Sequence, residues 1–506
     1  MGERVGMRRV PLSSQLRPTR DTTEFRLGPY EPNWFLIVLP TVIASGVVLP
    51  AKLHLFLIAG VGFFSFWRSR PAHGQRTSRL RFTWGSATLP ALSLAIILRP
   101  NDPATVTGAA IYVIGLIVFL YVLRLSSSKS SALVSLIDGV GIFLIASVLF
   151  TFVGVASKSD RTAGLENSIT GGKRVIFALS PHLAATPGVA GVFVAAIIPI
   201  LIVFRQFRLW RMTAMAFAFY VLVASQVRMA ILVAVVVAIA VLAFPRATRA
   251  ISAWLIAFLL SLPFFSRNAQ LDSLGHLGNA VSANIPGMNR TGGAGSVLST
   301  RLDIWEKAQA YQSAWVDWAH QIFGLGSFGH VRSGAALSYT TGENFTGFAD
   351  RHLITPHSST LMVLYDAGWV GVIVFVITIT FAARLLARGD SPVDLAALSA
   401  LIGLCLVGST EMGLTPETNM TIWWLLLGLV VVALSREEEL RSSREPASRG
   451  RLALPPSPVR PIFGPRSLGR LGPRLPGPAE PFAARKEPTP RVISPKGEGL
   501  RGSAYS

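Results

Sequence analysis

Long apolar runs separated by short polar turns make up most of the chain. Each run is about 15 to 26 residues long, close to the roughly 20 residues that an α-helix needs to cross a hydrocarbon core of about 30 Å. Lipid offers the backbone no hydrogen-bond partner, and the runs lack the alternating polarity of barrel strands, so we predict helices. We find twelve runs, at roughly 34–50, 53–67, 84–98, 107–124, 133–153, 188–204, 210–224, 228–244, 250–265, 358–383, 393–411 and 420–435.

The pattern predicts an all-α polytopic membrane protein with about twelve transmembrane helices. The composition agrees, because 51% of the residues are apolar and only 14% are charged. These values exclude an ordinary soluble enzyme. Cys405 is the one cysteine and lies within an apolar run, so the chain can form no internal disulfide, Cys-ligated zinc site or thiol relay.

The basic residues predict the orientation of the helices. If the N-terminus is cytoplasmic, the short inside loops hold fourteen lysines and arginines, whereas the short outside turns hold only Lys52, Arg99 and Arg228. This asymmetry follows the positive-inside rule for a multi-pass protein of the cytoplasmic membrane. It places residues 266–357 on the extracytoplasmic side. The formal net charge of +21 then reflects topology, so we expect membrane lipids and no nucleic acid as partners.

The topology divides the chain into five regions. The two ends are polar, and we expect no removable signal peptide and a disordered tail that touches anionic lipid near its start. The regions are a basic cytoplasmic segment at 1–33, helices 1–9 at 34–265, an extracytoplasmic loop with its own helices at 266–357 between helices 9 and 10, helices 10–12 at 358–435, and a Pro-rich basic cytoplasmic tail at 436–506.

The middle of the outer loop predicts a helix followed by a glycine turn. Thr300 is suited to cap the helix, Asp303 complements its dipole, and apolar residues then recur at helical spacing to about Ala319. The sequence Gly324-Leu-Gly-Ser-Phe-Gly329 permits a tight turn. A phosphate-cradling loop would need a preceding strand and a following lysine, and neither is present. Aromatic residues farther on, such as Tyr339, suit either a sugar ring or packing of the loop.

The end of the loop carries a candidate general base. Thr355 fits an N-cap, Pro356 the first helical position, and His357 the first turn of the next long apolar helix. The positive end of a helix favours a neutral imidazole that can accept a proton, and the same end attracts phosphate. A histidine at a membrane interface also occurs as a hydrogen-bonded structural residue.

Two arginines and one carboxylate share the predicted outer face with His357. Arg228 lies in the polar break between two apolar runs, and Arg301 lies in the loop, so together they form a candidate diphosphate clamp. Arg228 also fits a snorkelling anchor. Glu411 ends the eleventh run and is suited to orient the base, to pair with an arginine, or to lie at the interface without further role. No histidine pair has the spacing of a zinc motif, so we predict no metal site.

Several of these features together resemble the O-antigen ligase/O-antigen polymerase superfamily. They are the long outer loop, the Arg-x-x-x-Trp pattern at 301–305, the glycine pattern at 324–329 and the Pro-His pair at 356–357. The resemblance covers about residues 190–435. It implies that a glycan moves from a polyprenyl-diphosphate-linked donor to a hydroxyl of a glycan or glycolipid acceptor in cell-envelope polysaccharide biosynthesis. It also implies an active site on the extracytoplasmic face and no metal or other cofactor.

The resemblance implies a role for each candidate residue. By position, His357 corresponds to the catalytic histidine of the family, and Arg228 and Arg301 correspond to its diphosphate-binding arginines. Relatives often have asparagine after the histidine where this chain has Ser358, so the neighbouring acceptor contact differs. Ligase and polymerase differ in their acceptor, which no residue of this sequence names.

The hypothesis is therefore an inverting, metal-independent glycosyltransferase with His357 as base and Glu411 in a supporting role. The alternative is a multispan transporter or a flippase of lipid-linked glycans, because twelve spans are common among transporters. Paired helices with polar or broken midplane segments are typical of that class. Here charges within the apolar runs are sparse, with Asp138, Asp366 and Asp394 as the main exceptions.

Overall fold

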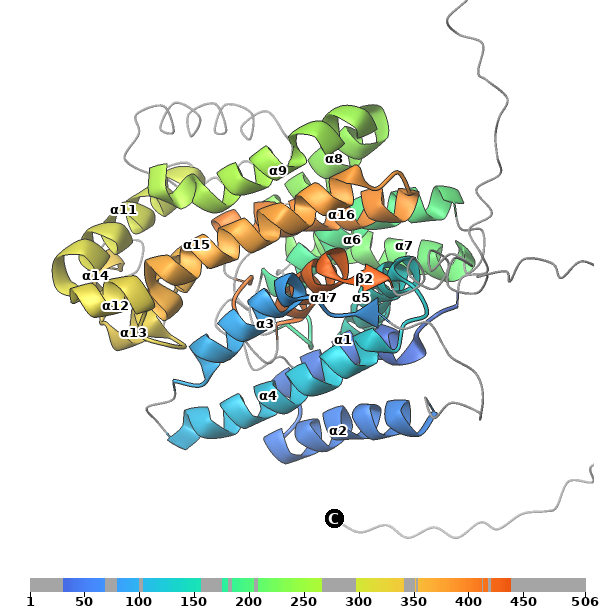
Figure 1. Cartoon of the computed structure of the whole chain (residues 1–506), viewed down its shortest axis with the longest axis horizontal. Helices are drawn as coiled ribbons and strands as arrows, with labels where there is room; N and C mark the ends of the chain where they lie inside the picture. The colour runs from blue at the N-terminus through green and yellow to red at the C-terminus, as the bar shows by residue number, and fades with distance from the viewer. Residues whose placement is uncertain are drawn as a thin grey trace, which may run out of the picture. The chain divides into compact units, whose positions relative to one another are not determined.

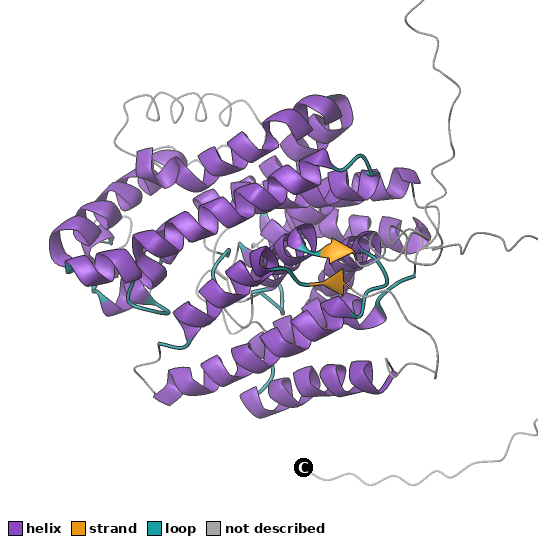
Figure 2. Cartoon of the chain, viewed as in Figure 1, coloured by secondary structure: helices purple, strands orange, loops and turns teal. Residues whose placement is uncertain are grey.

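The computed structural model describes residues 31–68, 80–99, 103–155, 175–180, 184–203, 208–265, 297–340, 351, 354–411, 413–416 and 420–437. Their regular secondary structure is helical apart from two strands of two residues each, with loops and turns between these elements, as Figure 2 shows. The predicted all-α fold is therefore confirmed. Most of the predicted N-terminal segment, nearly all of the predicted tail, and parts of the outer loop lie outside the described residues.

Each of the twelve apolar runs is a helix. Within the described residues, six helices are long and apolar enough to cross a membrane, namely α4, α5, α6, α9, α15 and α16, and four others are shorter and apolar. The chain is a membrane protein, and the number of twelve spans stays a prediction. The helices are α1 (Trp34–Ala44, continued by η2, Ser45–Val47), α2 (Ala51–Arg68), α3 (Trp84–Ile97), α4 (Pro103–Arg124), α5 (Lys129–Phe152), α6 (Ala185–Val203), α7 (Arg208–Ser225), α8 (Arg228–Ala243), α9 (Pro245–Ser261, continued by η4, Leu262–Phe265), α15 (Ser359–Arg388), α16 (Pro392–Thr410) and α17 (Thr421–Leu434).

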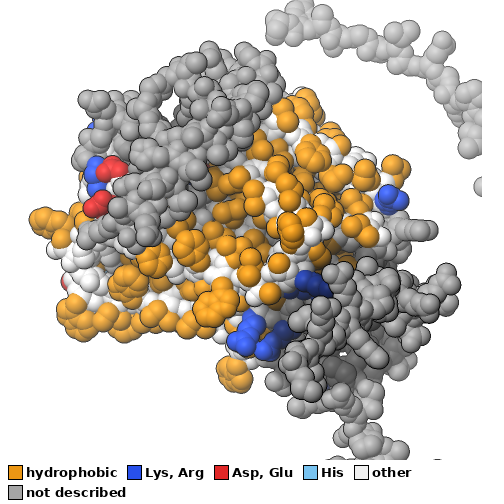
Figure 3. Space-filling model, turned by 90° about the horizontal axis from the view of Figure 1, so that it is seen from above, with side chains coloured by type: hydrophobic (Ala, Val, Ile, Leu, Met, Phe, Trp, Pro, Cys, Tyr) orange, Lys and Arg blue, Asp and Glu red, His pale blue; other side chains and the backbone are white. Residues whose placement is uncertain are grey.

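The bundle is built around α16. This helix packs against α6, α8, α9 and α15 (Figure 1). Most of its side chains are buried. Apolar side chains also cover much of the outside, including Phe56, Trp254 and Ile377, each more than 60% exposed. Figure 3 shows one such face, on which charged side chains of the described residues lie only toward its edges. A surface of this kind is suited to contact with lipid.

One end of the bundle gathers the loops that we predict to be cytoplasmic. Lys129 at the start of α5 lies 3.8 Å from a carboxylate oxygen of Asp394 at the start of α16. Arg249 in the first turns of α9 donates to the Ser391 carbonyl oxygen over 3.3 Å. Strand β1 (Leu80–Arg81) pairs antiparallel with β2 (Arg436–Glu437). The first two residues of the predicted disordered tail are thus ordered by pairing, and we call this end the basic end.

The opposite end carries the outer loop. Arg99, after α3, donates through Nη1 to the carbonyl oxygens of Phe323 and Gly324, each over 2.9 Å. Arg332 of the loop donates in turn to the Arg99 carbonyl oxygen over 2.9 Å. These contacts thus gather described residues of predicted inside loops at one end of the bundle, and they join Arg99, of a predicted outside turn, to the outer loop at the other end. Which end faces the cytoplasm stays a prediction.

A buried ion pair joins α5 to α7. Arg211 donates through Nε and Nη2 to the two carboxylate oxygens of Asp138, both over 2.8 Å, and neither side chain is more than 3% exposed. Arg211 lies in the first turn of α7, at the start of the predicted apolar run 210–224. A charge in an apolar interior is tolerated only with a partner, and the bidentate geometry supplies it.

Removing one member of this pair should destabilise the bundle. In Arg211→Met the Asp138 carboxylate stays buried without its partner, which costs about 3–5 kcal/mol in comparable buried pairs. We expect a large drop in the thermal unfolding midpoint of the detergent-solubilised protein. The double variant Asp138→Leu/Arg211→Met should recover most of that loss, and Arg208→Met, which changes an exposed arginine, should change little. A double variant no more stable than Arg211→Met would contradict this role.

Candidate functional site

The described part of the outer loop is a set of short helices beside one long one. They are α11 (Val297–Trp315), α12 (Trp318–Phe323), α13 (Gly329–Arg332) and α14 (Ala335–Tyr339). The predicted N-cap at Thr300 is wrong, because α11 begins three residues earlier. The predicted extension to Ala319 is also wrong. Asp317 accepts hydrogen bonds from the backbone N–H groups of Ala319 and His320, each over 3.2 Å, and so starts a new helix there.

The glycine turn, residues 324–329, is bound to α15. The N–H of Leu325 donates to the Tyr365 carbonyl oxygen, and the N–H of Gly326 donates to the Asp366 carbonyl oxygen, both over 2.8 Å. The N–H of Gly329 donates to the Asp366 carboxylate over 2.8 Å. These backbone N–H groups therefore donate to protein oxygens and are not available to a phosphate, in agreement with the prediction that the turn is not a phosphate-cradling loop. The bonds also explain why a carboxylate stands at position 366 within an apolar run.

Two glycines with left-handed backbone make this contact possible. Gly368 has φ 67° and interrupts the helical backbone inside α15, while Gly324 has φ 74°. A Cβ atom at Gly324 would lie 2.3 Å from the Ala367 nitrogen, and one at Gly368 would lie 2.2 Å from the Ile322 carbonyl oxygen. The break in α15 leaves the carbonyl oxygens near position 366 without partners in the helix, and the glycine turn supplies them.

His357 lies just before α15 and not in its first turn. The N-cap is Ser358, whose hydroxyl oxygen accepts from the Leu361 N–H, and the helix begins at Ser359. The predicted N-cap at Thr355 is therefore wrong, because the serine next to the apolar run supplies the capping oxygen. His357 has φ 48°, an uncommon backbone for a residue other than glycine that is found preferentially at functional sites.

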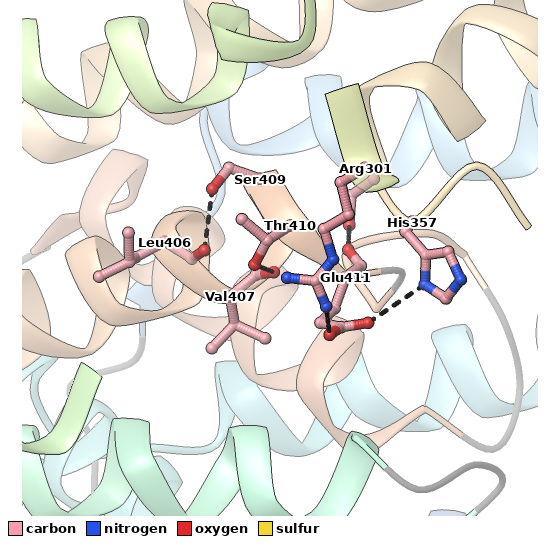
Figure 4. Close-up of polar contacts among 8 residues, drawn as sticks. Arg301, His357, Leu406, Val407, Ser409, Thr410 and Glu411 are labelled. Carbon is pink, nitrogen blue, oxygen red and sulfur yellow. Dashed lines mark hydrogen bonds and ion pairs between the residues drawn. The ribbon is translucent and has the colours of Figure 1, made fainter. Parts of the chain in front are cut away.

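Three predicted site residues meet at Glu411. Figure 4 shows the carboxylate of Glu411 between Arg301 of α11 and His357. Arg301 donates through Nη2 to Oε1 of Glu411. The Nδ1 atom of His357 lies 3.4 Å from Oε2 of the same carboxylate. The Arg301 and Glu411 side chains are 13% and 12% exposed, while His357 is 37% exposed. The cluster is therefore largely covered on its carboxylate side and open at the imidazole.

Ser359 fixes the position of Glu411 relative to His357. Its hydroxyl donates to the Glu411 carbonyl oxygen over 3.0 Å and accepts from the Leu414 N–H over 3.1 Å. Ser359 is fully buried, and it lies two residues after the histidine. It therefore joins the start of α15 to the end of α16. We did not predict this role, although the Ser358-Ser359 pair before the apolar run was a signal for a cap.

Tyr339 holds the segment that leads to His357. Its hydroxyl donates to the Ile354 carbonyl oxygen over 2.7 Å, and its ring is buried. Burial raises the pKa of the Tyr339 hydroxyl well above its usual range, so the group stays a neutral donor. Of the two interpretations of this aromatic residue, packing of the loop is therefore correct.

Arg228 is the first residue of α8, at the same end of the bundle as Glu411. The carbonyl oxygen of Ala230 lies against Gly191 of α6, and the neighbouring Gly188 lies against Val407 of α16. Val407 is one helical turn before Glu411. The contacts place the start of α8 level with the end of α16, and the Arg228 side chain is partly buried. A direct contact between Arg228 and the other three residues stays a prediction.

A family model described as O-Antigen ligase matches residues 213–376. The resemblance to the O-antigen ligase/polymerase superfamily is confirmed. Residues 213–376 are similar to the O-antigen ligase family. The matched segment runs from α7 into α15, so it contains Arg228, Arg301 and His357, while Glu411 lies beyond it. A match of this kind implies a glycosyltransferase-type activity with a lipid-linked glycan and an acceptor as partners. No curated protein matches the chain.

The other histidines of the matched segment do not form a metal site within the described residues. No group of three or more His, Cys, Asp or Glu side chains there is arranged to hold a metal ion. His320 pairs with Asp317 at the start of α12. His330 is buried, and burial lowers its pKa to about 4, so it is neutral at pH 7. Its neutral form favours the folded loop, and that contribution is lost as the pH falls from about 6.5 toward 4. His276 and His352 lie outside the described residues.

The contact between the glycine turn and α15 gives a prediction about the loop. Gly324→Ala should loosen the turn, because the added Cβ clashes with the Ala367 nitrogen and the φ of 74° is strained for alanine. We expect faster hydrogen–deuterium exchange in a peptide that covers residues 320–332, measured by mass spectrometry. The matched control is Gly60→Ala in α2, where the added Cβ meets nothing within 4 Å. Equal exchange in Gly324→Ala and wild type would show that the turn is not held in this way.

Proposed function

We propose that the chain is an inverting glycosyltransferase of cell-envelope polysaccharide biosynthesis, acting at the outer face of the cytoplasmic membrane. It moves a glycan from a polyprenyl diphosphate to a hydroxyl of a glycan or glycolipid acceptor. The observation that carries the proposal is the contact of Arg301 and His357 with the single carboxylate of Glu411, at the end of the bundle that holds the outer loop. The comparisons give no support to the transporter or flippase alternative, and we do not propose it.

In this proposal His357 is the general base. A carboxylate beside Nδ1 favours the tautomer that carries its proton there, and this leaves the lone pair on Nε2 to accept a proton. Glu411 also stabilises the imidazolium that forms during the reaction, as a buried carboxylate does for the histidine of hydrolase triads. The His357 side chain is the most exposed of the three, so an acceptor hydroxyl can approach it. Glu411 acts as a positioning residue.

The arginines bind the diphosphate of the donor. Arg301 uses Nη2 for Glu411 and has further N–H donors in the planar guanidinium for phosphate oxygens. Its charge is shared with that carboxylate, so we assign the second arginine, Arg228, as a further cation for the diphosphate. At about 4 Å and an effective dielectric constant near 20, one such charge pair contributes on the order of 4 kcal/mol.

The reaction is a single displacement. The acceptor oxygen forms a bond to the anomeric carbon while its proton passes to Nε2 of His357. The bond between the anomeric carbon and the phosphate oxygen breaks, and its electron pair leaves with the diphosphate. Arg228 and Arg301 stabilise the charge that develops there. Attack opposite to the leaving group inverts the anomeric configuration. The outer loop, held by the glycine turn, keeps both substrates in line.

Substitutions at the site should separate these roles. In reconstituted vesicles with a lipid-linked glycan and an acceptor, His357→Ala should lower turnover by about 10²–10⁴-fold, the usual contribution of a general base. Glu411→Gln should lower it by about 10–100-fold, because a charge-assisted hydrogen bond contributes about 1.5–3 kcal/mol. His320→Ala, at the exposed histidine of α12, is the matched control and should stay near wild type. Near wild-type turnover of His357→Ala would rule out the assigned base.

Metal independence gives a separate prediction. Because the arginines are proposed to neutralise the diphosphate, transfer should continue at an unchanged rate when EDTA is added to washed vesicles. Restoring activity with Mg²⁺ or Mn²⁺ after EDTA would show that a divalent ion takes part, and the assignment of Arg228 and Arg301 would then have to change. Arg301→Lys keeps the charge but loses the planar donor pair, and it should retain only a small part of the activity.

A further inference from the structure

A cavity lies at the basic end of the bundle, apart from the candidate active site. Its volume is about 460 Å³. It is bounded by residues 31–35 at the start of α1, by the last turn of α2 with Ser65 and Arg68, and by the turn and helix start at 125–131. Nothing in the proposed transfer reaction uses these residues.

The length of α16 gives the separation between the cavity and the candidate active site. Ser131 of the cavity stands in the first turn of α5, beside Lys129, which pairs with Asp394 at the start of α16. Glu411 follows the other end of α16. A helix of this length rises by roughly 28 Å at 1.5 Å per residue. The cavity and the Glu411 cluster therefore lie at opposite ends of the bundle.

The wall of the cavity is held by hydrogen bonds. The Asn33 side-chain amide donates to the Val122 carbonyl oxygen over 2.9 Å and to the Ser126 hydroxyl over 3.0 Å. The Asn33 backbone N–H donates to the Ser135 hydroxyl over 3.0 Å. The Ser131 hydroxyl donates to the Glu31 carbonyl oxygen. The segment before α1 is thus tied to α4 and α5, so the cavity is formed before any ligand binds.

The cavity presents one acidic and one basic side chain. Glu31 and Arg68 both line it, and among the described residues neither side chain is joined to another group by a hydrogen bond or ion pair. A purely anionic ligand would be repelled by Glu31, and a purely cationic one would be repelled by Arg68. A ligand that carries both a phosphate and an ammonium group satisfies both charges.

The surroundings of the cavity fit a lipid. Along α2, which ends at Arg68, Phe56, Phe63 and Trp67 are 71%, 65% and 64% exposed. Trp34, at the rim of the cavity, is 55% exposed. Aromatic residues are enriched where membrane helices reach the headgroup region. Acyl chains can therefore lie along α2, which Figure 1 shows at the edge of the described bundle beside α4.

From these observations we propose that the cavity binds the headgroup of a phospholipid with an ethanolamine headgroup. Arg68 binds the phosphate, Glu31 binds the primary ammonium, and the acyl chains lie on the apolar face of α2. Ethanolamine is favoured over choline because its N–H groups can donate to the Glu31 carboxylate, and a quaternary ammonium cannot. This proposal is independent of the proposed transferase activity.

The test measures lipid binding to the full-length protein. Delipidated protein in detergent is titrated with phosphatidylethanolamine, phosphatidylglycerol or phosphatidylcholine of identical acyl chains, and bound lipid is counted by native mass spectrometry. We expect phosphatidylethanolamine to bind about tenfold or more tightly than the other two, the scale of one charge-assisted hydrogen bond. Soluble glycerophosphoethanolamine forms a separate arm and should compete only weakly if the acyl chains contribute.

Two variants distinguish the two charges. Arg68→Gln should weaken binding of phosphatidylethanolamine and phosphatidylglycerol alike. Glu31→Gln should weaken the binding of phosphatidylethanolamine. Phosphatidylglycerol should then bind this variant as tightly as phosphatidylethanolamine does, or more tightly, because the repulsion between Glu31 and an anionic headgroup is removed. Arg124→Gln, an exposed arginine of the same end that does not line the cavity, is the matched control. Each variant is compared only if its thermal unfolding midpoint matches wild type.

Three results would overturn the proposal. One is equal binding of the three lipids by the wild-type protein. Another is tight binding of phosphatidylcholine, which would remove the role of the Glu31 hydrogen bonds. The last is that Arg68→Gln and Glu31→Gln both behave as Arg124→Gln does, in which case the lipid binds elsewhere on the bundle.

Discussion

The break in α15 is the constraint on which the arrangement of the site depends. A transmembrane helix normally satisfies its own backbone, and an interruption at membrane depth is tolerated only where other protein groups replace the lost bonds. The interruption at Gly368 frees carbonyl oxygens that the amides of the glycine turn then bind. This contact holds the outer loop against the bundle. It also fixes the short helical piece from Ser359 to Gly368, and His357 lies just before that piece.

The loop and the bundle meet a second time at Glu411. Arg301 comes from the loop, His357 from the segment that ends it, and Glu411 from the end of α16. Ser359, the first residue of α15, is hydrogen-bonded to the Glu411 carbonyl oxygen and to the Leu414 N–H and so connects α15 to the segment after α16. A long loop closed at only one point could move against the bundle, whereas two attachments restrict that movement. The catalytic geometry that we propose therefore depends on backbone contacts made about ten residues away from the histidine.

The sequence predicted the helices well because a run of apolar residues can satisfy its backbone in lipid in only one way. It predicted the helix ends poorly. Thr300 and Thr355 are both acceptable caps, yet α11 begins earlier and Ser358 caps α15, because a cap depends on neighbours that only the folded chain provides. Arg301, His357 and Glu411 could be assigned to one face from topology alone. That the Glu411 carboxylate lies between the other two side chains could not be predicted, because Arg301 and Glu411 are 110 residues apart in the sequence.

The carboxylates inside the apolar runs show how a structural polar group differs from one that is suited to a reaction. Asp138 accepts hydrogen bonds from Arg211. Asp394 accepts one from the capping Ser391 and pairs with Lys129. Asp366 accepts one from the backbone of the glycine turn. Each of these carboxylates has a partner that explains its presence, so none needs a reaction to account for it. Glu411 differs because it joins a cation to an imidazole that stays more than a third exposed. The imidazole is open to an incoming molecule, whereas the ion pair within the bundle is not, and for this reason we propose the loop end of the bundle as the place of the chemistry.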